Sequence, residues 1–440
     1  MTPMTLSFRH PGPSVPPVVA AESKYLGGQS FGWLVIVASL VLLAGSFGTQ
    51  LTFGVFLKPL SLEFGWTRAA TSGAMSLAMG LSGVIGVVMG RLTDRFDVRL
   101  AIGVGAALGA ACYLLLARLH SLWQFYLYFG LGGGICIGST YAPVSAIVSK
   151  WFKERRALAL GLALMGISVG QMVLTPVSAR LIDTAGWRPA YVVLAVVIVV
   201  CALPALFLLG RKPPTTTPPV PVTPGLQSSG YKPTSEANLS ENPADGLNTR
   251  QAARTAPFWM IMITGVAIAA GFYITAAHIV PAATDAGITS TSAALILTVS
   301  SIVGIPGTVV GTWWLTKRLG HRLALLVLCV GQAVALFLFA LVSQLWAFYL
   351  VAALLGFCFA ASTPVRQAMA PPLFGLKAVG SILGLAYLAW SAGALLGPFL
   401  AGLIYDLTAN YDLAFILGGV LLLTGAVSVH LWGGHKQVPR

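Results

Sequence analysis

The stretch LTDRFDVR at residues 92–99 recurs 223 positions later as LTKRLGHR at residues 315–322. Three further pairs keep nearly the same offset along the chain. They are KPLSLEFGWT (58–67) with VPAATDAGIT (280–289), APVS (142–145) with TPVR (363–366), and LIDTAGW (181–187) with LIYDLTANY (403–411). A single match of this length carries little weight, but four in register over the whole chain indicate a duplication.

A polar segment, residues 211–257, separates the two copies. It is rich in Pro, Ser, Thr and Asn and has no apolar periodicity, which is typical of a flexible linker. The predicted organisation follows in chain order. It comprises a cytoplasmic tail (1–31), a six-helix bundle (32–210), a cytoplasmic linker (211–257), a second six-helix bundle (258–432) and a cytoplasmic tail (433–440).

The composition indicates a membrane protein. Hydrophobic residues make up 57% of the 440-residue chain and charged residues only 9%, against about 25% charged in soluble domains. Twelve apolar stretches are long enough to cross a bilayer about 30 Å thick as helices. We therefore predict an all-α fold of twelve transmembrane helices in two pseudo-symmetric bundles. The predicted spans are 32–57, 70–90, 100–117, 122–149, 157–182, 189–210, 258–283, 291–315, 323–343, 346–371, 379–404 and 412–432.

The positive charges predict the orientation. Of 26 Lys and Arg residues, 20 fall in the tails and in the loops on the same side, which places both termini in the cytoplasm. Arg366 lies inside a span, and the other side holds five: Lys58, Arg68, Arg118, Arg180 and Arg188. The net charge of +14 is thus an orientation signal and not a nucleic-acid surface. We expect a monomer in the plasma membrane, which is the inner membrane if the protein is bacterial.

A six-plus-six repeat predicts a substrate site between the bundles near the middle of the membrane, with the bundles rocking around it. The sequence contains no GxxxxGK[ST] segment, HExxH motif or catalytic triad, which argues against an ATP-driven pump and against an enzyme. The five cysteines fall inside apolar runs without CxxC spacing. We therefore expect no metal and no cofactor.

The stretch GRLTDRFDVR (90–99) resembles the loop signature of the major facilitator superfamily, in which it latches a cytoplasmic gate. Gly90 ends a small-residue face that permits close helix contact. Asp94 can accept hydrogen bonds from a neighbouring helix, and Arg95 and Arg99 suit an anionic membrane surface. We assign Arg155 and Arg156, in the matching loop of the same bundle, to this gate as well. Topology charges alone remain the alternative.

WFKERRALALGLALMG (151–166) resembles the helix-5 signature of the monocarboxylate porter family, and SFGW (30–33) is similar to part of its helix-1 signature. The resemblance implies a carrier of small organic anions, with cavity-lining helices 1, 4, 7 and 10. Two features depart from the animal members. Leu51 occupies the place of a helix-1 lysine, and helix 8 has no ionisable residue in place of an Asp/Arg pair.

No acidic residue is predicted in the middle of the membrane, because all twelve lie in tails, loops or span ends. A carrier of cations usually needs a buried carboxylate, so this absence favours an anionic or neutral substrate. Arg366 is the one Lys or Arg expected inside a span and away from its ends. Two roles fit it: binding a substrate carboxylate through its planar fork, or satisfying backbone carbonyls and snorkelling to the interface.

Further candidates are His278, Gln50, Tyr141, Tyr273, Tyr387 and Trp390. His278, near Pro281 in helix 7, can carry a proton near neutral pH, or it can be a hydrogen-bonded structural residue. The other five are predicted to share substrate binding, although each also fits simple packing.

The sequence therefore predicts an alternating-access secondary carrier of a small organic anion. The expected cargo is a monocarboxylate, and the expected mode is symport with a proton. Two alternatives stay open: an exporter of neutral or amphiphilic compounds, and a membrane sensor that transports nothing.

Overall fold

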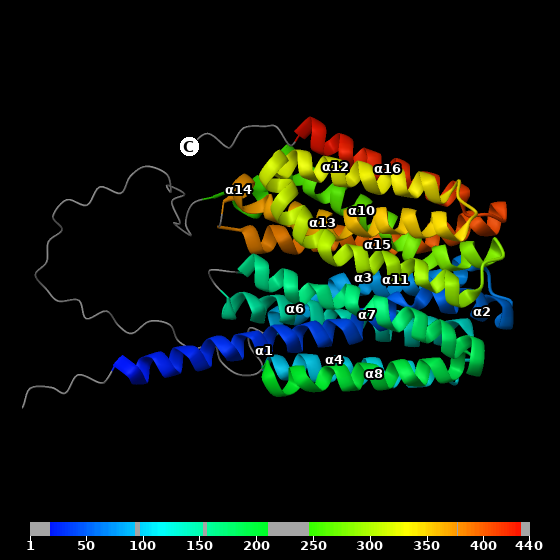
Figure 1. The fold of residues 1–440 in the computed structure, drawn as a ribbon, viewed down its shortest axis with the longest axis horizontal. Helices are drawn as coiled ribbons and strands as arrows, with labels where there is room; N and C mark the ends of the chain where they lie inside the picture. Colours follow the sequence, from blue (N-terminus) through cyan, green and yellow to red (C-terminus); the bar gives the residue numbers. More distant parts are fainter. Residues whose placement is uncertain (1–17, 93–96, 153–155, 210–245, 376, 433–440) are drawn as a thin grey trace, which may run out of the picture.

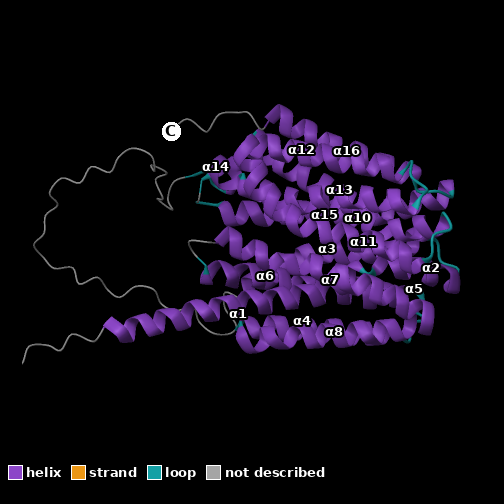
Figure 2. Cartoon of the chain, viewed as in Figure 1, coloured by secondary structure: helices purple, strands orange, loops and turns teal. Residues whose placement is uncertain are grey.

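The computed structural model describes residues 18–92, 97–152, 156–209, 246–375 and 377–432. The N-terminal half lies on one side of the molecule and the C-terminal half on the other, with the helices roughly parallel to one long axis (Figure 1). Helices account for almost all of the described chain, and the β pairing seen within it is the isolated bridge between Gly246 and Gly375 (Figure 2).

The N-terminal half makes six crossings. Its elements are α1 (Val18–Leu51) continued by α2 (Phe53–Phe64), α3 (Arg68–Leu92), α4 (Val98–Leu116), the run of α5 (Leu122–Phe125), η1 (Tyr126–Gly132) and α6 (Gly133–Trp151), α7 (Arg156–Ala185) and α8 (Trp187–Leu208). The first helix thus begins at Val18, earlier than the predicted residue 32, and is interrupted at Thr52.

The C-terminal half follows a short helix, α9 (Thr249–Ala252). Its elements are α10 (Ala256–Asp285), α11 (Ser290–Val309) with η2 (Val310–Leu315), α12 (Thr316–Phe339), α13 (Leu345–Ala368) with α14 (Ala370–Phe374), α15 (Val379–Thr408) and α16 (Asp412–Trp432).

Within the described residues, eleven helical segments are long and apolar enough to cross a membrane. One of them, Ser290–Phe339, is 50 residues long and contains a break at Gly320, where φ is 74° and ψ is 163°. Glycine tolerates this left-handed region because it has no Cβ. The break reverses the chain and divides the segment into two crossings, which gives the twelve that the sequence predicts.

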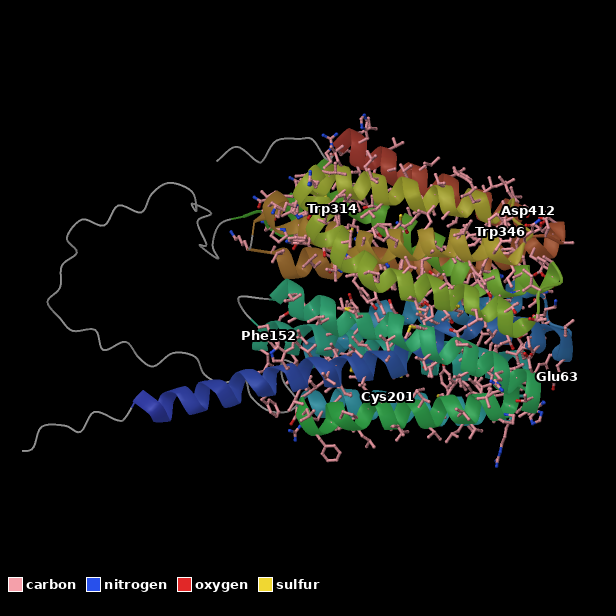
Figure 3. The ribbon with its side chains drawn as sticks, viewed as in Figure 1. Glu63, Phe152, Cys201, Trp314, Trp346 and Asp412 are labelled. Carbon is pink, nitrogen blue, oxygen red and sulfur yellow. The ribbon has the colours of Figure 1, made fainter. Side chains whose placement is uncertain are left out.

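We call the end of the bundle at which α1 begins and α16 ends the proximal end, and the opposite end, with the α2–α3 connection, the distal end (Figure 1). Glu63, Trp346 and Asp412 lie toward the distal end and Phe152 toward the proximal end (Figure 3). Exposed tryptophans occur near both, with Trp314 49% and Trp346 63% exposed. Such rings favour membrane–water interfaces, so the two levels are consistent with the edges of a bilayer.

The two halves meet along two long seams, α3 against α15 and α7 against α11, and along a shorter contact of α2 with α10. In the first seam, small residues of α3 face α15. A Cβ at Gly80 would contact the Leu395 side chain, and one at Gly83 would overlap Ser391. Small residues let helices approach closely in a membrane, where packing is a main source of association.

This first seam ends before the proximal end. Of the α3 glycines that face α15, Gly86 is the last before the proximal end. A Cβ added at Gly86 would lie 3.6 Å from Tyr387 Cε1. Farther along α15, Gly384 and Gly380 have open space where a Cβ would point. The halves are therefore in close contact from the distal end to the level of Tyr387 along this seam, and then diverge.

The contact at Gly83 generates a prediction. Gly83→Ala should lower the stability of the protein by about 1–3 kcal/mol, because an overpacked interface forces its helices apart. Ser391→Gly should restore most of the loss in the double variant, because it removes the side chain that the new methyl group meets. Thermal unfolding in detergent, with all four proteins of the cycle, measures this coupling.

Gly161→Ala on α7 is the matched control, since a Cβ there meets nothing within 4 Å and the change mainly adds helix propensity. Equal stability of the Gly83 and Gly161 variants would contradict the close approach of α3 and α15.

Candidate functional site

A cavity of about 80 Å³ lies between the two halves, at the middle of the bundle. Six helices contribute to its wall. Four of them, α1, α6, α10 and α13, are the expected crossings 1, 4, 7 and 10. The other two, α7 and α15, are crossings 5 and 11. The lining residues are Phe47, Leu51, Tyr141, Ile167, Phe272, Tyr273, Phe359, Arg366, Gln367, Tyr387 and Trp390.

Arg366 is the one charged residue of this lining. It is 2% exposed, so it does not snorkel to an interface. Its Nη1 donates a hydrogen bond of 3.1 Å to the Ile261 carbonyl on α10, whereas its buried Nε has no hydrogen-bond partner within the described structure. Gly265 makes room for the group, because a Cβ there would lie 2.9 Å from Nη1.

Aromatic rings form most of the remaining wall. Tyr141 of the N-terminal half stacks on Tyr387 of the C-terminal half, with centroids 4.8 Å apart and planes 10° from parallel. Tyr387 in turn stacks on Trp390 at 5.5 Å, and Trp390 meets the edge of Tyr273 at 5.3 Å. The Tyr141–Tyr387 pair therefore joins the two halves at the wall of the cavity.

The structure brings five of the six predicted substrate residues to this cavity: Arg366, Tyr141, Tyr273, Tyr387 and Trp390. Gln50 is the exception and requires a correction of its expected position. It is 1% exposed inside the N-terminal half, where its Oε1 accepts a hydrogen bond of 3.0 Å from the Tyr113 hydroxyl. Its side chain lies between α4 and the start of α6, because a Cβ at Gly133 would also meet its side-chain amide.

Several lining residues were not predicted, notably Phe47, Phe272, Phe359 and Gln367. One signal was available in the sequence. Phe359 and Arg366 are seven residues apart, which places them on one face of a helix, and Gln367 is the next polar residue after the buried cation. Leu51, noted as the replacement for a lysine, also lies in the cavity wall.

The distal end is closed by a polar network centred on Arg68, the first residue of α3. Its guanidinium pairs with Asp285 of α10 at 3.2 Å and donates to the Tyr411 hydroxyl at 3.0 Å. The Asp406 carboxylate of α15 accepts hydrogen bonds of 2.8 Å from the backbone N–H groups of Arg68 and Ala69. A carboxylate from one half thus caps a helix N-terminus of the other half.

His278 of α10 lies beside this distal network, against α15, and not in the cavity. It is fully buried, and its Nε2 is 2.8 Å from the Pro398 carbonyl, which also accepts a hydrogen bond from Ser72 at 2.9 Å. A carbonyl only accepts, so Nε2 carries the proton. Nδ1 is buried without a partner within the described structure, and the Tyr411 ring lies 5.1 Å away.

The predicted gate at the proximal end is largely outside the described residues, since Asp94, Arg95 and Arg155 all fall there. Arg156 begins α7, and Gly90 lies near the end of α3. Arg99 follows Asp97, whose carboxylate accepts the Arg99 backbone N–H at 3.0 Å and caps α4. The gate assignment therefore stays a prediction.

A larger hollow of about 270 Å³ lies at the distal end, between α2, α7 and α10. Apolar side chains form much of its wall. Its cation, Lys58, already pairs with Asp285 at 2.6 Å, and its acid, Asp183, accepts a hydrogen bond from Thr291 at 2.9 Å. The central cavity, whose cation has a nitrogen without a partner, is therefore the better candidate for the binding site.

The chain belongs to the Major Facilitator Superfamily, whose family model matches residues 34–345 and 279–439. It is similar to monocarboxylate transporter 13 of Bos taurus, at 28% identity over 397 residues that cover 90% of this chain and 88% of that protein. Monocarboxylate transporter 11 of Homo sapiens is 28% identical over 405 residues, which cover 90% of this chain and 82% of that protein.

A solved structure shares the fold. The bacterial homologue of the human lysosomal transporter Spinster, in an inward-facing and unoccupied conformation, superposes with a TM-score of 0.66 at 16% identity, over 93% of this chain and 99% of that one. The family match and these relatives confirm the resemblance that residues 90–99 and 151–166 predict. The protein is a multi-pass membrane transporter related to monocarboxylate transporters, and not an enzyme.

Proposed function

We propose that this transporter carries a small organic monocarboxylate by alternating access, with Arg366 as the residue that binds the carboxylate. The observation that carries the proposal is a guanidinium buried in a cavity between the two halves with its Nε unpaired. We further propose that the proximal end faces the cytoplasm, since the Lys and Arg residues gather on the side of the termini.

Within the described residues no acidic side chain pairs with Arg366, which supports an anionic cargo. The ion pairs within the described residues involve Lys58, Arg68 and Arg188, and none involves Arg366. A buried guanidinium is expensive unless its hydrogen bonds and charge are satisfied. A carboxylate fits because its two oxygens can each accept from one side of the planar fork.

The closed distal end supports a rocking mechanism. Loading from the distal side requires the Arg68, Asp285 and Asp406 contacts to break, because they join the halves on the distal side of the cavity. The same movement would bring the proximal parts of α3 and α15 together, where Gly380 and Gly384 leave room for close contact. The cavity is then exposed to one side at a time.

We predict that Arg366→Gln weakens carboxylate binding about ten- to a hundredfold, because one charge-assisted hydrogen bond contributes about 1.5–3 kcal/mol. Arg366→Lys should restore only part of this affinity, since an ammonium lacks the planar fork. The amide of the same acid should bind the wild type weakly and lose little more in the variant. Dissociation constants measured by calorimetry on purified protein test this.

Equal weakening of acid and amide, or no weakening of either, would show that Arg366 serves the fold through its bond to Ile261. Tight binding of the amide would instead favour a carrier of neutral compounds.

We propose that any proton coupling runs through His278 or through the carboxyl group of the substrate. Nδ1 of His278 is unpaired within the described structure and can take a proton once the contacts at the distal end open and admit water. The charged groups near it are Arg68 of α3 and Asp406 of α15, and the Tyr411 hydroxyl lies beside Arg68. Both charged groups belong to the network that must open, which links protonation to the distal gate.

His278→Ala should therefore flatten the pH dependence of uptake for an acid that stays ionised over the range tested. Ser72→Ala is the matched control, because it removes the other hydrogen bond to the Pro398 carbonyl without removing a titratable group. Uptake into liposomes at pH 5.5 to 8 measures both. A His278→Ala profile that superimposes on the wild type would exclude His278 from proton transfer.

A further inference from the structure

The seven aromatic side chains of the cavity form one continuous series of ring contacts. The series begins in the N-terminal half, where Phe47 and Tyr141 have centroids 6.0 Å apart. It crosses to the C-terminal half at the Tyr141–Tyr387 stack and continues through Trp390 and Tyr273. It ends with Tyr273 against Phe272 at 5.3 Å and Phe272 on Phe359 at 3.7 Å.

We infer that the cargo is an aromatic monocarboxylate with a single ring, bound with its ring among these side chains and its carboxylate on Arg366. The inference rests on the proposed function and adds the chemical class of the apolar part. An aliphatic tail needs only an apolar wall, which Leu and Ile side chains provide. Here Leu51 and Ile167 are the only aliphatic residues of the lining, and rings occupy seven positions.

Ring walls favour aromatic ligands for an electrostatic reason. Each ring has a negative face and a positive edge, so that aromatic pairs gain from offset-stacked or edge-to-face contact beyond the area that they bury. The wall shows both geometries, with Tyr387 and Trp390 planes 15° apart and Tyr273 and Trp390 planes 79° apart. A planar ring can therefore find both a face and an edge, whereas a saturated ring has no quadrupole to match.

The position of the guanidinium fits a carboxylate at one end of this wall. Nη1 is held by the Ile261 carbonyl and Nε is buried without a partner within the described structure, so we assign the carboxylate to the Nε side of the fork. Phe359 and Arg366 lie seven residues apart on α13, which separates their Cα atoms by about 10 Å along the axis. A ring near Phe359 and a carboxylate near Arg366 thus suit an acid with a short chain between the two groups.

The cavity volume suits a ligand with one ring. A space of about 80 Å³ holds roughly five to eight water molecules at 10–15 Å³ each. That favours a one-ring acid over a fused polycyclic acid in this conformation.

The test compares 3-phenylpropanoate with 3-cyclohexylpropanoate, which share chain length, carbon count and charge. Wild-type protein should bind the phenyl acid about three- to tenfold more tightly, although the cyclohexyl acid is the more apolar. Trp390→Leu, which keeps an apolar wall but removes a ring, should bring this ratio close to one, and Tyr273→Leu serves if that variant does not fold. Ile167→Leu is the matched control and should leave the ratio unchanged.

The proposed function and this inference can fail separately. Affinities for both acids that are equal in the wild type, and that both fall in Arg366→Gln, would overturn the aromatic preference and leave the carboxylate site intact. A phenyl preference that persists in Trp390→Leu and in Tyr273→Leu would likewise overturn the role of the rings. Affinities that Arg366→Gln does not change would instead overturn the carboxylate site, whatever the ratio of the two acids.

Discussion

The cost of burying Arg366 is the constraint on which this molecule depends. Its guanidinium is 2% exposed inside an apolar bundle and, among the described residues, has one hydrogen bond, to the Ile261 carbonyl. A charge in that position is tolerated only where it faces a cavity or finds a partner. The residues around Arg366 accommodate the buried guanidinium. Gly265 leaves space for the group, and the rings from both halves enclose a small cavity beside it. On the proposed function, a ligand that supplies an acceptor to Arg366 would also contact rings from both halves.

The contacts between the halves differ along the bundle. Along α3 and α15 the contact depends on small residues of α3, Gly80 and Gly83, which let α15 approach closely. The charged contacts gather at the distal end, where Lys58 and Asp285 are partly exposed and Arg68 is buried. Removing one partner of a buried pair leaves the other charge without compensation. In the proposed mechanism these contacts therefore have to break and form together.

The sequence predicts the fold well because duplication and hydropathy are properties of whole segments. Twelve crossings, the two halves and the burial of Arg366 follow from them. The sites of individual side chains depend on rotation about each helix axis, which apolar periodicity does not define when all faces are apolar. Gln50 illustrates this, since it turns toward Tyr113 in its own half. Nothing in the sequence distinguishes Phe272 and Phe359 from the other apolar residues of their spans, and the Arg68 network joins positions that are more than 200 residues apart.

Opposite movement of the two ends of the bundle is the central claim, and distances between spin labels test it most directly. One pair, Thr184→Cys with Asn410→Cys, spans the distal end between the halves, and a second, Leu92→Cys with Lys377→Cys, spans the proximal end. All four residues are exposed. In liposomes with and without an acid that binds, we predict that the distal distance increases in every condition in which the proximal distance decreases. Distances that change in the same direction, or stay fixed while transport continues, would contradict alternating access by rocking of the two halves.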